Sequence, residues 1–134
     1  MDIEKILNNV VFNYGWRVDS DFILFGKNNS IKIIFDSYDE NELINHIQKN
    51  CLNQLNEKES EYSNIVISLL KTYIVENKIS IETKNIENEI NLTSILITQE
   101  GDVLFLFEVN WDIENGLCIK VIPEYDIGPQ DVFL

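Results

Sequence analysis

The sequence is poor in the residues that most often carry out chemistry. It contains one histidine, His46, two cysteines, Cys51 and Cys118, and five scattered glycines. General acid–base catalysis most often uses histidine, and no Ser/His/Asp or Cys/His set can be assembled from a single one. The small number of histidines and cysteines excludes a zinc site, and the scattered glycines exclude a glycine-rich phosphate loop. We therefore expect a protein that is not an enzyme and that holds no metal and no cofactor.

Basic residues are also scarce, because 10 Lys and Arg stand against 23 Asp and Glu and leave a net charge of −13. Nucleic-acid binding requires clustered basic side chains, and an anionic membrane surface repels a protein of this charge. No apolar run approaches the roughly 18 residues of a membrane span. The acidic start, with Asp2 and Glu4, does not resemble an export signal. We expect a cytoplasmic protein that contacts neither nucleic acid nor membrane.

The remaining composition favours one folded domain over residues 1–134. The hydrophobic fraction is 45%, too high for a disordered acidic tail. A chain of this length can bury roughly two-thirds of its unfolded surface without a disulfide or a metal. Cys51 lies in a helical pattern and Cys118 in a strand pattern, without metal-ligand spacing. We expect two free, buried thiols, although a disulfide between them stays possible.

Hydrophobic periodicity predicts an α+β fold in the order β-β-β-α-α-β-β-β. Helical stripes at about 40–56 and 60–77 predict two consecutive helices packed on one face of a largely antiparallel sheet. Asp39 and Glu42 have the spacing of a capping box at the start of the first helix. For residues 79–91 a short strand, an irregular connection and a short helix are all open. The expected strand segments are 10–12, 22–25, 31–35, 94–98, 103–109 and 117–122, with turns at 26–30, 99–102 and 112–116.

The C-terminal third carries a distinctive motif, Trp111-Asp112-x-Glu114-x-Gly116-Leu117 followed by Ile127-Gly128-x-x-Asp131. It resembles the closing signature of a group of small bacterial domains of unknown function, W-D-x-E-H-G-L and then I-G-x-x-D. Related small acidic proteins occur among the immunity proteins of polymorphic and contact-dependent toxin systems. The resemblance implies a similar order of strands and helices and a toxin domain as partner. Asn115 replaces the usual histidine, so any role of that histidine is missing here.

The paired carboxylates Asp112 and Glu114 have two interpretations. In the first, they belong to a turn that fixes strand register, with Asp112 accepting backbone N–H bonds. In the second, they form the carboxylate site of a small hydrolase, which requires that they converge in a concave pocket. Their spacing does not match a calcium-binding EF-hand loop.

Acidic residues cluster at 36–42, 57–61, 82–89 and 108–131, which gives the molecule a field of one sign. Such a field accelerates association with a basic partner, and nuclease toxins are basic because they bind nucleic acid. The leading hypothesis is an immunity-type protein that occludes a cognate basic toxin domain; the alternatives are the small hydrolase and an acidic DNA-mimic regulatory binder. Trp111 is either a core residue or an interface anchor. The candidate partner-binding residues are Glu108, Trp111, Asp112, Glu114, Glu124, Tyr125, Asp126 and Asp131.

Overall fold

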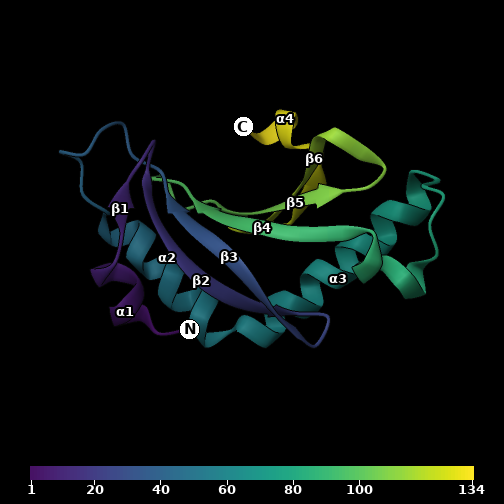
Figure 1. The fold of residues 1–134 in the computed structure, drawn as a ribbon, viewed down its shortest axis with the longest axis horizontal. Helices are drawn as coiled ribbons and strands as arrows, with labels where there is room; N and C mark the ends of the chain where they lie inside the picture. The colour runs from purple at the N-terminus through teal and green to yellow at the C-terminus, as the bar shows by residue number, and fades with distance from the viewer.

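A curved sheet organises the fold, as the computed structural model of residues 1–82 and 84–134 shows (Figure 1). Within these residues the sheet has seven strands, which lie side by side in the order of the sequence. Neighbouring strands are antiparallel except for the parallel pair β3–β4. The strands are β1 (Val11–Phe12), β2 (Trp16–Leu24), β3 (Lys27–Phe35), β4 (Ile90–Ile97), β5 (Val103–Val109), β6 (Asp112–Ile122) and β7 (Asp126–Gly128).

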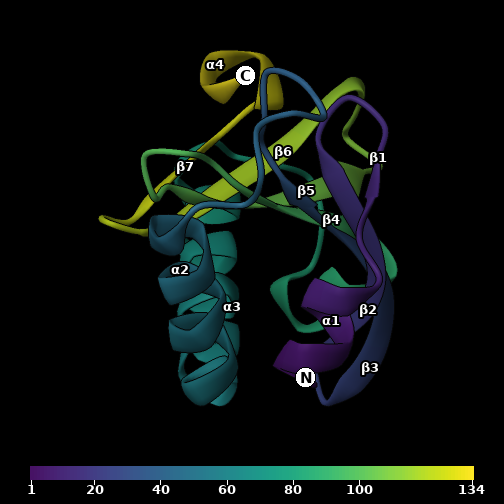
Figure 2. The same cartoon turned by 90° about the vertical axis from the view of Figure 1, so that its left-hand side faces the viewer.

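Two long helices, α2 (His46–Glu57) and α3 (Glu59–Glu76), connect β3 to β4 and cover one face of the sheet (Figures 1 and 2). The predicted fold class and element order are therefore confirmed. The described residues add four short elements to the predicted order: the strand β7, the helices α1 (Ile3–Asn8) and α4 (Gln130–Phe133), and the 3-10 helix η1 (Thr83–Asn88). Figure 2 shows α4 on the side of the sheet away from α2 and α3. None of the helices in the described residues is long and apolar enough to cross a membrane.

The core lies between the helices and the facing side of the sheet. Successive strand residues point to opposite faces, so β5 buries Phe105 and Phe107 under the helices while Glu108 faces solvent. The rings of Phe22 and Phe105 meet edge to face, with centroids 5.0 Å apart. Helix α3 contributes a stripe at four-residue spacing, as predicted, in which each side chain is at most 5% exposed: Tyr62, Val66, Leu70 and Ile74.

The start of the first long helix differs from the prediction. Helix α2 begins at His46 and not near residue 40, so the Asp39–Glu42 capping box is wrong. The capping box that forms is Asn45–Gln48: the Asn45 side chain accepts the Gln48 N–H at 2.8 Å, and Gln48 Oε1 accepts the Asn45 N–H at 3.0 Å. Both pairs have the required spacing, but only the second directly precedes the buried stripe of α2. Residues 36–45 consequently form a loop.

Gln48 also ties this loop to the sheet. Its side chain is only 1% exposed, and its Nε2 donates to the carbonyl oxygens of Asp36 and Ile97 at 2.9 and 3.1 Å. These two carbonyls lie where the parallel strands β3 and β4 end. A single buried amide therefore links both strand ends to the helix that follows β3.

Several strands also begin earlier than predicted, and β2 begins at Trp16 and not at residue 22. β3 begins at Lys27, so the turn is Phe25-Gly26 rather than 26–30. Both turn residues have positive φ, +56° and +68°, which is the backbone of a two-residue hairpin turn. β4 begins at Ile90, and η1 precedes it, which resolves the open interpretation of residues 79–91 in favour of a short helix followed by a strand.

We predict that Gln48→Ala lowers the free energy of unfolding by about 3 kcal/mol, because it removes three hydrogen bonds of a buried side chain. The Asp36 carbonyl and the Asn45 N–H lose their described partner, and the Ile97 carbonyl keeps only the Asp36 N–H at 3.0 Å. Gln54→Ala on the same helix is the matched control, since Gln54 is exposed and donates one bond, to the Tyr62 hydroxyl at 2.6 Å. It should cost less than about 1 kcal/mol. Urea denaturation of both variants measures the difference, and equal losses would contradict the role given to Gln48.

Candidate functional site

The connection from β5 to β6 is a tight turn followed by a large β-bulge. Val109 pairs with Asp112 and Phe107 pairs with Leu117, so Glu108 alone stands opposite residues 113–116. The predicted turn at 112–116 is therefore wrong: the chain reverses at Asn110-Trp111, and 112–116 already belong to β6. Such bulges re-aim side chains and are common beside functional sites.

Polar contacts within the bulge hold it in place. Asp112 Oδ1 accepts the Asn115 N–H at 3.2 Å, and its Oδ2 accepts the Asn115 side-chain amide at 3.4 Å. Gly116 has φ +61°, and a Cβ there would lie 2.6 Å from the Phe107 carbonyl oxygen. Gln130 Nε2 donates to that same oxygen at 2.9 Å. Helix α4 therefore packs on the bulge through Gln130. The two halves of the sequence motif, residues 111–117 and 127–131, are in contact at this point.

This geometry does not build the pocket that a carboxylate enzyme needs. Asp112 is engaged with Asn115, Glu114 is exposed, and neither lines a described pocket. Among the described residues, no group of three His, Cys, Asp or Glu could hold a metal ion. Trp111 is half-buried and packs against the core. The hydrogen bonds of Asp112 and the positive φ of Gly116 favour the first interpretation, in which these residues fix the backbone between β5 and β6.

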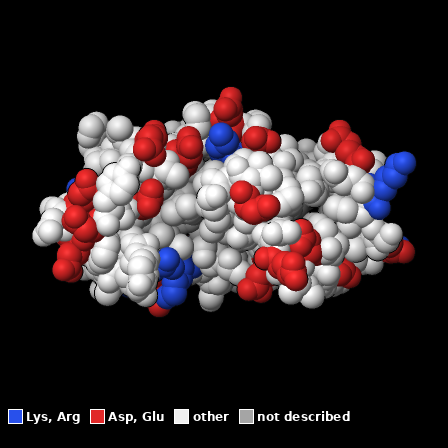
Figure 3. All heavy atoms as spheres, turned by 90° about the horizontal axis from the view of Figure 1, so that it is seen from above, with Lys and Arg blue, Asp and Glu red and all other residues white. Residues whose placement is uncertain are grey.

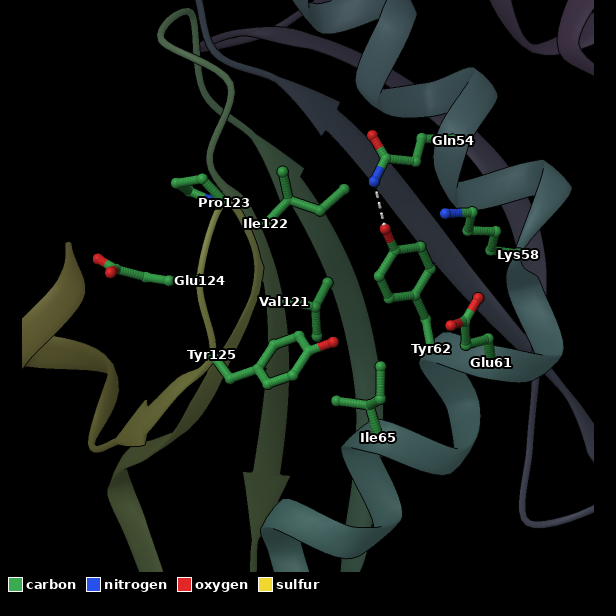
Figure 4. A pocket seen from close by; sticks show the side chains of 10 residues that line it. All are labelled: Gln54, Lys58, Glu61, Tyr62, Ile65, Val121, Ile122, Pro123, Glu124 and Tyr125. Atoms are coloured by element: carbon green, nitrogen blue, oxygen red, sulfur yellow. Dashed lines mark hydrogen bonds between the residues drawn. The ribbon is translucent and has the colours of Figure 1, made fainter.

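Three further candidates, Glu124, Tyr125 and Asp126, lie at the other end of β6. Glu124 Oε1 is 3.7 Å from Lys120 Nζ, and Asp126 stands opposite Lys120 in the β6–β7 register. Tyr125 is directed toward α3 and lines an open hollow of about 430 Å³, whereas Glu124 points away from it (Figure 4). In the same hollow the Tyr62 hydroxyl receives the bond from Gln54 (Figure 4). The eight candidates therefore form two groups and not one continuous site.

Three of the eight candidates are available for a partner. Glu108, Glu114 and Asp131 are exposed, and none has a described side-chain hydrogen bond or ion pair. These three residues lie at the bulge and in α4. In the same two segments the apolar side chains of Ile113 and Val132 are 88% and 73% exposed. Acidic and apolar side chains thus coincide at this end of the molecule.

Acidic side chains are distributed over the whole surface. All 23 Asp and Glu lie in the described residues, and each is exposed or half-buried. Only three ion pairs are described, Lys32–Asp19, Lys84–Glu82 and Lys120–Glu124. Figure 3 shows the face that carries α4, where acidic groups recur along the length of the molecule and basic groups are few. Most of the negative charge is therefore uncompensated.

Sequence reasoning missed the loop at residues 36–45. Tyr38 and Leu43, which the helix prediction placed at a helix start, are 83% and 76% exposed. Tyr14, in the nearby β1–β2 turn, is 91% exposed. The signal that could have found this loop is the second capping box, Asn45–Gln48, because it moves the helix start beyond Leu43.

Both cysteines are free and buried. Burial and, after it, the negative charge of Asp126 raise the pKa of the Cys118 thiol to about 12, and the positive charge of Lys120 opposes this rise. Burial and then the Asp102 carboxylate raise the pKa of Cys51. The pKa of the Tyr73 hydroxyl is also raised, first by burial and second by the negative charge of Asp112. This effect shows that the Asp112 carboxylate lies near α3. Neither thiol has the lowered pKa of a nucleophilic cysteine.

We predict that Gly116→Ala destabilises the fold by about 3 kcal/mol, from the positive φ together with the clash against the Phe107 carbonyl. Gly26→Ala is the matched control, since Gly26 also has positive φ, +68°, but its Cβ would meet nothing within 4 Å. It should cost about 1 kcal/mol. Chemical denaturation separates the two, and equal costs would show that Gly116 is needed for its backbone angle alone.

We predict that neither thiol reacts with a disulfide reagent in the native protein at pH 8, whereas both react in denaturant. The folded state keeps Cys118 protonated well above the ordinary thiol pKa of 9.0. Its contribution to stability is therefore present below pH 9 and lost as the pH rises toward 12. Stopped-flow absorbance measures the reaction, and rapid modification of Cys118 in the folded protein would contradict its burial.

Comparison with known proteins identifies a family without a described activity. The family model described as "Domain of unknown function (DUF6985)" matches residues 6–134. No curated protein matched the chain in a sequence search, and no solved structure matched it either. Because the match takes in nearly every element from α1 to α4, the chain belongs to the DUF6985 family of domains of unknown function.

Proposed function

We propose that this protein is an immunity-type inhibitor that binds and neutralises a basic, nuclease-like toxin domain. The observation that carries the proposal is the placement of the acid: the net charge is −13, and none of the 23 carboxylates is buried. A surface of this kind attracts a basic partner over a distance and repels nucleic acid. The resemblance of the C-terminal motif to immunity-associated domains supports the same function.

Neutralisation by this protein needs no chemistry of its own. A nuclease must present basic side chains in its substrate groove, since the groove binds phosphates. An acidic protein that covers the groove replaces those phosphates and excludes the substrate. The described residues offer exposed carboxylates for this purpose.

The free carboxylates at the bulge and α4 have a defined part in this proposal. Glu108, Glu114 and Asp131 are exposed, so each interacts with a partner through solvent and is screened by salt. Exposed charges at an interface change the association rate more than the dissociation rate. We assign these three residues to electrostatic steering, and the other five candidates to structural duties or the pocket beside α3.

The test uses the purified protein and a catalytically inactive form of the toxin domain encoded beside its gene. We predict that the association rate falls at least about tenfold between 50 mM and 500 mM salt, with a smaller change in dissociation. Surface plasmon resonance measures both rates. Absence of a neighbouring toxin domain, or of binding at low salt, would refute the proposal; binding to nucleoid or restriction proteins instead would favour a DNA mimic.

Charge-reversal variants separate local steering from total charge. Changing Glu108, Glu114 and Asp131 to Lys alters the net charge by 3 × 2 = 6, from −13 to −7. The same change at the exposed residues Glu4 in α1, Glu57 at the end of α2 and Glu61 at the start of α3 is the matched control. We predict a larger loss of association rate for the first set, whereas equal losses would show that position at the bulge is unimportant.

A further inference from the structure

A second surface, at the opposite end of the sheet from the β2–β3 hairpin turn, is built from two segments distant in sequence. We call it the loop surface: the β3–α2 loop, residues 36–45, and the β1–β2 turn, residues 13–15. A Cβ on Gly15 would lie 3.1 Å from the carbonyl oxygen of Phe35, so the turn packs against the end of β3, where the loop begins. The two segments lie side by side in both Figures 1 and 2.

The loop surface presents large side chains that the fold does not use. Tyr14 is 91% exposed, Tyr38 is 83% exposed and Leu43 is 76% exposed. No described hydrogen bond reaches either tyrosine hydroxyl. Ordinary surfaces expose single apolar residues, but several on adjacent segments mark an interaction site. Tyrosine in particular is enriched among the residues that dominate interface energies.

Hydrogen bonds hold the backbone under these side chains in one conformation. Trp16 Nε1 donates to the Glu42 carbonyl at 2.7 Å, and Ser37 Oγ donates to the same oxygen at 2.9 Å. Glu42 Oε2 accepts the Tyr38 N–H at 3.2 Å and Gln99 Nε2 at 2.8 Å. The loop is therefore ordered before any partner arrives, which lowers the entropic cost of binding.

A largely apolar hollow adjoins the loop. It has a volume of about 370 Å³, and its walls include Trp16, Leu43 and Ile44 from the loop side and Leu7 and Val10 from the N-terminal segment. Two polar residues, Asn8 and Lys49, complete its lining. A hollow of this size and lining accepts one or two apolar side chains. It provides a place for insertion beside the two exposed tyrosines.

Charge decides which partner fits. The loop carries Asp36, Asp39 and Glu40, all exposed, next to the hollow and the tyrosines. An apolar partner surface without basic groups would leave these carboxylates desolvated and unpaired, at a cost in free energy. The complementary surface therefore has an apolar side chain surrounded by Lys or Arg, whose guanidinium can also stack on a tyrosine ring.

We infer that the loop surface is the anchoring contact for the basic protein partner of the proposed function, on which this inference rests. Tyr14, Tyr38 and Leu43 dock on the partner, and the hollow receives one of its apolar side chains. The carboxylates at the bulge steer the approach, whereas the loop surface determines how long the complex lasts.

The experiment measures how fast variants of exposed tyrosines dissociate from the inactive toxin domain. The double variant Tyr14→Ala, Tyr38→Ala should raise the dissociation rate at least about 30-fold, the range of interface hot spots. Tyr125→Ala removes a 58% exposed tyrosine at the far end of β6 and should change the dissociation rate less than about twofold. Thermal unfolding of each variant checks that the fold is intact. Hydrogen exchange of the wild-type complex should show new protection in residues 36–45.

The outcomes separate this inference from the proposed function. Wild-type protein that does not bind the toxin domain refutes the function, and the inference falls with it. If the wild type binds but the double variant dissociates at the wild-type rate, or if protection appears at the bulge and not in 36–45, the loop surface is not the anchor. In that case the proposed function still stands.

Discussion

The buried amide of Gln48 is the contact on which the arrangement of the molecule depends. The sheet consists of two antiparallel groups, β1–β3 and β4–β7, that meet only at the parallel pair β3–β4. Parallel neighbours need a long connection, which α2 and α3 provide. The Gln48 side chain accepts the Asn45 N–H and donates to the carbonyl oxygens of Asp36 and Ile97, at the ends of both strands. It therefore determines where α2 begins and where the preceding loop is bound to the sheet.

The C-terminal motif has a mainly structural explanation. Asp112 closes the bulge, Gly116 allows the Phe107 carbonyl to come close, and Gln130 bonds to that carbonyl and carries α4 onto the sheet. The residues that attract attention in the sequence therefore hold two distant segments together. The residues free to meet another molecule include Glu114 and Asp131 from the motif and Glu108 and Tyr38 from outside it, all exposed.

Sequence reasoning recovered the features that depend on periodicity. The nearly continuous apolar run from Val103 to Val109 and the i, i+3, i+4 spacing from Tyr62 to Ile74 predicted a strand and a helix close to those observed. It failed where two local signals competed. The choice between Asp39 and Asn45 as helix cap is decided by the burial of Gln48, and the bulge at 112–116 is decided by contact with Gln130. Both are tertiary contacts, which no local pattern contains.

The edges of the sheet have a further consequence for how the protein behaves at high concentration. β1 has two residues and β7 has three, so both edge strands are short. β1 pairs only with Arg17 and Trp16 of β2, and the uncovered part of β2 carries the exposed carboxylates of Asp19 and Asp21. Short edges and charged edge residues both discourage strand addition. The charges on β2 therefore oppose the addition of a second copy along its uncovered edge.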